Sequence, residues 1–302
     1  MTGSGRPGLV AWTGRVLGAI AAVYLGYVSV LGSKRLVQPA TRPFEAPVDG
    51  WPTSPADLDL PWEDVRFTTD DGVTLSGWLI PAERETRAAV VVMHGFTGHR
   101  LRELAAFVPW LRRRYHVLQF DFRGHGASDP GSITLGSLER RDVAAAVRFV
   151  ESRGMGPVAL MGLSMGAAVA IVSAPELPVA AVVADAAFAD LAHPVASRMR
   201  AQRYPLAELG ARLIVAAAWL RAGTRLISPI DRVARIAPRG LLLIAPREDA
   251  LISWRQSQRL YEAAGEPKEL WVVDGAEHAT ARWVAGPAYE ERVLAFLERH
   301  LG

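Results

Sequence analysis

A Gly-x-Ser-x-Gly motif at residues 162–166 constrains the fold of this chain more than any other feature. It lies directly between an apolar segment, residues 157–161, and a run of small apolar residues, 167–173. The first segment is typical of a short buried strand and the second of a packed helix. Glycines flank a serine in so sharp a turn because side chains there would collide with the strand and helix. The motif therefore predicts an α/β fold that presents Ser164 as a nucleophile.

A serine hydroxyl becomes a good nucleophile when a histidine takes its proton and a carboxylate orients that histidine. The apolar run 240–245 is followed by Glu248 and Asp249, and the strand-like segment 269–273 is followed by His278. The order serine, acid, histidine, each just after a strand, predicts a triad of Ser164, Asp249 and His278. Glu248 and Asp185, which ends another strand-like segment, are alternatives for the acid.

Two further motifs follow predicted strands. Residues 88–93 lead into His94-Gly95-Phe96, and residues 115–120 lead into Asp-Phe-Arg-Gly-His-Gly-Ala-Ser at 121–128. Together with the serine turn and His278, they resemble the α/β-hydrolase superfamily over residues 65–300, and within it the small-capped, anchored Bem46-like and serine-aminopeptidase-like hydrolases. Many relatives carry Gly-x-x-Asp where this chain has Ala-Pro-Arg-Glu-Asp at 245–249.

The resemblance implies an α/β-hydrolase fold with a mostly parallel, doubly wound sheet and a small helical cap. It also implies an oxyanion hole formed by the backbone amides of Phe96 and Met165. Histidines at the positions of His94 and His125 mostly fix loop geometry in this family, and we expect Asp121 and Arg123 to form an ion pair within their turn. No cofactor or metal is predicted, because cysteine is absent and the histidines lack ligand spacing.

The N-terminal region predicts a membrane helix. Residues 16–33 carry no charge and are long enough to span a bilayer, with Arg15 before them and Lys34-Arg35 after. We expect residues 1–35 to form an uncleaved single-pass anchor, with a cleaved signal peptide as the alternative. Basic residues flank the span on both sides, so the side of the membrane that holds the catalytic domain stays open. Residues 36–62 are rich in proline and predict an extended linker.

The remaining 63–302 are of a length that suits one hydrolase domain, with residues 188–238 as its cap insertion. Within the insertion, apolar residues recur at helical spacing and form either a core-facing stripe or a face that rests on lipid. These residues are Leu206, Leu209, Leu213, Ala217 and Leu220. The chain has a modest net charge of +3, and its basic residues are spread along the sequence, so no nucleic-acid partner is expected.

These features predict a membrane-anchored serine hydrolase that cleaves carboxylic esters or thioesters through an acyl-enzyme. A small-molecule or lipid-like acyl compound is the expected substrate. An aminopeptidase-like amide hydrolase is one alternative, and it would need acidic residues to bind a substrate amine. A non-catalytic binding protein on the same fold is another, although such proteins usually lose a member of the triad.

Overall fold

The computed structural model describes residues 9–39, 41, 44–45 and 50–302. Within them one eight-stranded sheet has the order β1-β2-β4-β3-β5-β6-β7-β8. The first two strands form an antiparallel hairpin on β4, and β3 to β8 are parallel. The strands are β1 (Glu63–Thr68), β2 (Thr74–Ile80), β3 (Ala89–Met93), β4 (His116–Phe120), β5 (Val158–Leu163), β6 (Val179–Asp185), β7 (Gly240–Pro246) and β8 (Lys268–Val273).

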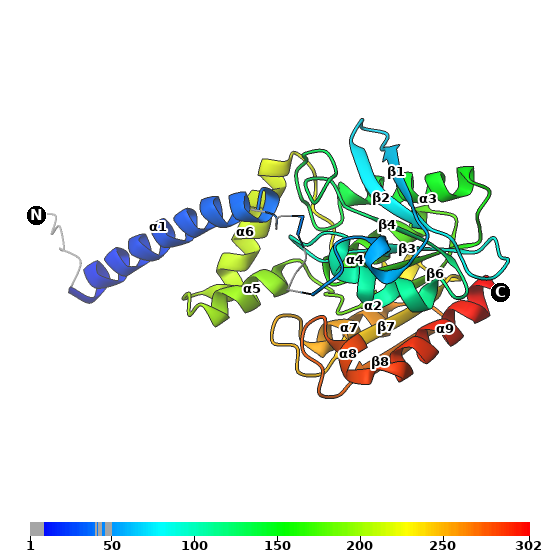
Figure 1. Cartoon of the computed structure of the whole chain (residues 1–302). Helices are drawn as coiled ribbons and strands as arrows, with labels where there is room; N and C mark the ends of the chain where they lie inside the picture. Colours follow the sequence, from blue (N-terminus) through cyan, green and yellow to red (C-terminus); the bar gives the residue numbers. More distant parts are fainter. Residues whose placement is uncertain (1–8, 40, 42–43, 46–49) are drawn as a thin grey trace, which may run out of the picture.

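Helices cover both faces of this sheet, as the prediction of a doubly wound α/β fold requires (Figure 1). Alternate residues of β3 point to opposite layers: Val91 packs with the layer of α3, α4 and α7, whereas Val92 packs with that of α2, α8 and α9. Burial on both faces explains why these strands are continuously apolar. The helices are α2 (Leu101–Leu111), α3 (Glu139–Ser152), α4 (Met165–Ser173), α7 (Trp254–Ala263), α8 (Ala281–Ala285) and α9 (Pro287–Leu301).

The cap insertion consists of helices α5 (Ala192–Ala201) and α6 (Ala207–Ala222) followed by two short 3-10 turns, η3 (Pro229–Asp231) and η4 (Val233–Arg235). Only the two helices form a separate layer. Val233 and Ile236, near the end of the predicted insertion, belong to the main core. The segment predicted as a linker contains a 3-10 turn, η1 (Pro55–Leu58), and partly falls outside the described residues.

A long N-terminal helix, α1 (Leu9–Val37), projects from the domain and ends beside α6 (Figure 1). Its stretch Ala11–Val37 is long and apolar enough to cross a membrane, although a signal sequence would pass the same test. The helix is exposed along its N-terminal half but makes defined contacts at its C-terminal end, where Ser33 and Val37 are buried. The carbonyl of Val37, the last residue of α1, accepts a hydrogen bond from the Ile133 amide at 2.8 Å.

The leucine stripe of α6 does not face the core. Leu206, at the residue preceding the helix, and Leu209, Leu213 and Leu220 within it are exposed, Leu220 to 83%. The buried face is instead formed by Ala207, Gly210, Ala211, Ile214 and Ala218. Periodicity identified two faces of this helix but not which one is buried, because α6 packs through small residues against α1 and α5.

Candidate active site

Ser164 occupies the turn between β5 and α4 with φ 54° and ψ −110°. A non-glycine residue in this region is strained, typically by about 1–3 kcal/mol, and the surrounding structure must hold it there. Its amide donates to the Asp185 carbonyl at 2.8 Å. A Cβ on Gly162 would lie 2.2 Å from the Gly166 backbone, so the turn closes only with glycine. This geometry presents the Ser164 hydroxyl beyond the end of the sheet.

His278 and Asp249 lie beside this serine. The His278 Nε2 is 3.0 Å from the Ser164 Oγ, and the His278 Nδ1 is 2.6 Å from the Asp249 Oδ2. The other Asp249 oxygen accepts the backbone amides of Leu251 and Ile252, at 2.8 and 2.7 Å. The carboxylate is fully buried, whereas the imidazole is 27% exposed. Three residues from three separate loops thus form a continuous hydrogen-bonded chain.

The two alternative acids lie elsewhere. Glu248 is exposed, and among the described residues the partner of the His278 Nδ1 is Asp249. Asp185 accepts a hydrogen bond from the Tyr289 hydroxyl at 2.8 Å, while its second oxygen has no partner among the described residues. Burial raises the pKa of Asp185 to about 7, against the opposing effect of the Tyr289 hydrogen bond. The carboxylate that contacts His278 is therefore that of Asp249.

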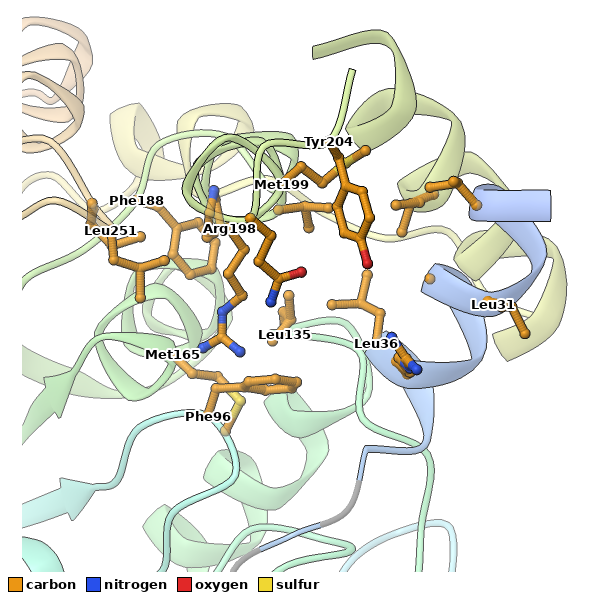
Figure 2. Close-up of a pocket in the computed structure, with 18 of the residues that line it drawn as sticks. Leu31, Leu36, Phe96, Leu135, Met165, Phe188, Arg198, Met199, Tyr204 and Leu251 are labelled. Atoms are coloured by element: carbon orange, nitrogen blue, oxygen red, sulfur yellow. The ribbon is translucent and has the colours of Figure 1, made fainter. Parts of the chain in front are cut away.

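The loop after β3 lies against the serine turn. A Cβ on Gly166 would lie 2.4 Å from the Met93 carbonyl oxygen, so the two loops approach as closely as backbone allows. Phe96 and Met165 line the same cavity as Ser164 (Figure 2). Met165 is the first residue of α4, where amides have no acceptor within the helix. The predicted oxyanion donors therefore lie on the two segments that meet at the serine.

His94 fixes this loop, in line with the role expected of it. Its Nδ1 is 2.8 Å from the Gly95 carbonyl, and its Nε2 accepts the Phe122 amide at 3.1 Å. These contacts assign the Nδ1–H tautomer, and burial together with nearby His125 holds the pKa of His94 well below its usual range. A neutral histidine thereby connects the loops after β3 and β4.

The predicted pairing of Asp121 with Arg123 is wrong. Asp121 pairs with Arg100 at 2.5 Å, and Arg123 pairs with Asp71 and Asp142. Both side chains are buried, but each pairs with oppositely charged residues on other segments of the chain. The Asp121 pair joins the loops that follow β3 and β4, whereas Arg123 holds the β1–β2 hairpin turn against α3.

A cavity of about 390 Å³ opens at Ser164 and extends between the cap and α1 (Figure 2). Its walls are mostly apolar, and among its described lining residues none is acidic. Two arginines, Arg35 and Arg198, lie on it without a carboxylate partner in the described chain. Figure 2 shows the Arg198 guanidinium directed toward Met165 and Phe96. The contribution of α1 to this cavity was missed from sequence, where its apolar residues indicated only a membrane span.

No group of three or more His, Asp or Glu residues in the described chain lies close enough together to hold a metal ion.

Comparison with known proteins relates the whole domain to hydrolases. Residues 84–215 match the family model "Serine aminopeptidase, S33". The chain is 30% identical over 251 residues to the uncharacterized protein YfhR of Escherichia coli O157:H7, covering 78% of this chain and 81% of YfhR. It is 27% identical over 291 residues to a polyketide transferase, GrgF, of a Penicillium species, covering 80% of this chain and 98% of GrgF.

Among solved structures, an esterase of Pyrococcus furiosus, Pf2001, superimposes with a TM-score of 0.72 at 31% identity, covering 87% of this chain and 99% of the esterase. This chain matches these proteins over most of its length. The matched chain contains the eight-stranded sheet and the strained turn that carries Ser164. The chain belongs to the α/β-hydrolase superfamily.

Proposed function

We propose that the protein is a serine hydrolase that cleaves carboxylic esters through an acyl-enzyme. The hydrogen-bonded chain from Ser164 through His278 to Asp249 carries this proposal, since a nucleophile, a base and an orienting acid within bonding distance are what acyl transfer needs. Similarity to the Pyrococcus furiosus esterase supports an ester as the scissile group.

In the proposed reaction the Ser164 Oγ attacks the ester carbonyl carbon and its proton passes to the His278 Nε2. The carbonyl electrons move to oxygen, and the amides of Phe96 and Met165 stabilise the resulting oxyanion. Collapse of this intermediate breaks the bond to the alcohol, which leaves with the proton from His278. Water then attacks the acyl-enzyme with His278 as the base, releasing the carboxylic acid and restoring Ser164. Asp249 holds the imidazole in the required tautomer throughout.

The composition of the cavity favours esters over aminopeptidase substrates. A substrate α-amine would be held by carboxylates, whereas the described cavity lining contains two arginines and no acid. An ammonium group there would meet like charge, which is unfavourable where solvent is partly excluded. The apolar walls instead suit an acyl chain.

We further propose that α1 anchors the protein in a membrane as a single span. Within residues 16–31 its exposed side chains are mainly apolar, including Leu17, Ile20 and Val23. Exposed apolar surface of this extent is unfavourable in water but suits lipid. The exposed leucine stripe of α6 lies on the helix that packs against α1, so lipid could cover both.

The test combines covalent labelling with turnover. The wild-type protein should react with a fluorophosphonate probe and release nitrophenol from p-nitrophenyl butyrate. Ser164→Ala should abolish labelling and lower turnover by about four orders of magnitude or more, as in other broken triads. Ser152→Ala, at an exposed serine of α3, is the matched control and should behave as wild type. Labelling of the Ser164→Ala protein, or faster release of nitroaniline from amino-acid p-nitroanilides than of nitrophenol from esters, would overturn the proposal.

A further inference from the structure

One face of α1 forms a wall of the cavity that opens at Ser164. Its lining residues fall at positions 24, 27, 28, 31, 32, 35 and 36, which is the spacing of a single helical face. Phe188 and Met199 line the cavity from the side of the cap (Figure 2). The nucleophile and the N-terminal helix are therefore joined by one continuous, mostly apolar space.

The helix is packed specifically against the cap. A Cβ on Gly32 would lie 2.6 Å from the Ile214 side chain, so α1 and α6 approach through this glycine. The Tyr24 hydroxyl donates to the Pro205 carbonyl at 3.0 Å, and the Arg221 Nε lies 3.3 Å from the Ser33 Oγ. Small residues and interhelical hydrogen bonds are typical of helices that associate in or near lipid. These contacts make α1 a third helix of the cap.

The surface around this three-helix unit is apolar as well. Leu213 and Trp219 of α6 are exposed, and so are Val23 and Tyr27 of α1. Tyr27 both lines the cavity and is 65% exposed, so the cavity reaches the outer surface at the helix that is long enough to span a membrane. The apolar face of α1 thus runs from the exposed surface at Tyr27 along the cavity that opens at Ser164.

We propose that α1 forms part of the acyl-binding site and that the cavity receives the long acyl chain of a lipid ester from the bilayer. This inference rests on the proposed esterase function. It assigns α1 a role in substrate selection besides attachment to the membrane, and it names the substrate class as long-chain esters. The cavity volume of about 390 Å³ lies within the range of small-molecule sites, roughly 300–1,000 Å³.

A substitution that fills the cavity from α1 tests this role in the full-length protein, reconstituted in phosphatidylcholine vesicles. Val28 lines the cavity, whereas Val30 does not and is 58% exposed. Val28→Trp should lower the ratio of kcat/KM for p-nitrophenyl palmitate to that for the butyrate about tenfold, the effect of losing roughly two buried methylene groups. Val30→Trp adds the same bulk outside the cavity and should leave the ratio unchanged. An unchanged ratio in labelled, folded Val28→Trp would overturn the inference.

A second measurement does not depend on how a variant folds. A long-chain alkyl fluorophosphonate with a diazirine near its chain end is reacted with the wild-type protein in the same vesicles and irradiated. Crosslinks should fall on residues 24–36 of α1, with or without others on α5 and α6. Labelled Ser164 with no crosslink on α1 would overturn the acyl site while leaving the esterase proposal intact. Absence of any Ser164 labelling would instead overturn the proposed function.

Discussion

Glu103 offers a test of how the loop that carries Phe96 is held. This residue is in the first turn of α2 and is 2% exposed. Its carboxyl accepts a hydrogen bond from the Gly95 amide, next to Phe96, while one oxygen has no partner among the described atoms. Burial raises the pKa of Glu103 to about 8, with Arg102 and the Gly95 hydrogen bond acting in the opposite direction. The buried group is therefore mostly neutral at pH 7.

The raised pKa makes stability fall with rising pH. Between pH 4.5, the ordinary value, and about 8 the unfolded chain ionises Glu103 while the folded protein keeps the proton. Each pH unit well inside that window costs about 1.4 kcal/mol and less near its ends, so the folded protein loses about 3.5 kcal/mol from this group between pH 5 and pH 8. The contribution of Glu103 to the free energy of unfolding is complete below pH 4.5 and is lost as the pH rises toward 8.

Glu103→Gln removes the titration and keeps an oxygen for the Gly95 amide. The unpaired amide hydrogens of Gln add a cost, but that cost does not depend on pH and cancels in the comparison. At roughly 2 °C per kcal/mol for a chain of this size, the Tm of the variant relative to wild type should rise by about 7 °C between pH 5 and pH 8. Thermal unfolding followed by tryptophan fluorescence measures it, with exposed Glu151→Gln as the control. A Tm difference that stays constant across this range would refute the reasoning.

Two further predictions concern the serine site. Gly166→Ala would bring a Cβ 2.4 Å from the Met93 carbonyl, so overpacking should cost about 1–3 kcal/mol in unfolding free energy and abolish fluorophosphonate labelling. A Cβ on Gly95 would have its nearest neighbours at 3.7 Å, so the Gly95→Ala protein should keep the Tm of wild type in differential scanning calorimetry. A Tm loss equal to that of Gly166→Ala would contradict this account. Arg198→Glu should lower kcat/KM for a ring-carboxylated nitrophenyl butyrate about tenfold relative to the neutral ester, since it replaces attraction by repulsion. Arg198→Gln should fall between, and an unchanged ratio would show that Arg198 does not face the leaving group.

The parallel sheet and the position of Ser164 could be predicted because each depends on local sequence. Apolar runs define buried strands, and the glycines at 162 and 166 permit the turn that follows β5. The acid was harder to choose, because three carboxylates follow strands that end at the same edge. The neighbour that distinguishes Asp185 is Tyr289, 104 residues away in sequence, and no local pattern predicts that contact. The Asp121 pairing failed for the same reason, since its partner Arg100 lies on another loop.

The residues of α1 fit two roles, that of a candidate membrane span and that of a wall of the cavity. A membrane span alone needs only apolar residues, and it tends to place tyrosine at its ends rather than mid-span. Tyr24 and Tyr27 lie mid-span, and both line the cavity, with Tyr24 bonded to the cap. Gly32 leaves room for the Ile214 side chain, a close contact that a position facing lipid would not require. If α1 were instead removed as a cleaved signal peptide, the cavity would lose this wall. The proposed acyl site therefore requires that α1 be retained in the mature protein, because only an uncleaved helix can line the cavity.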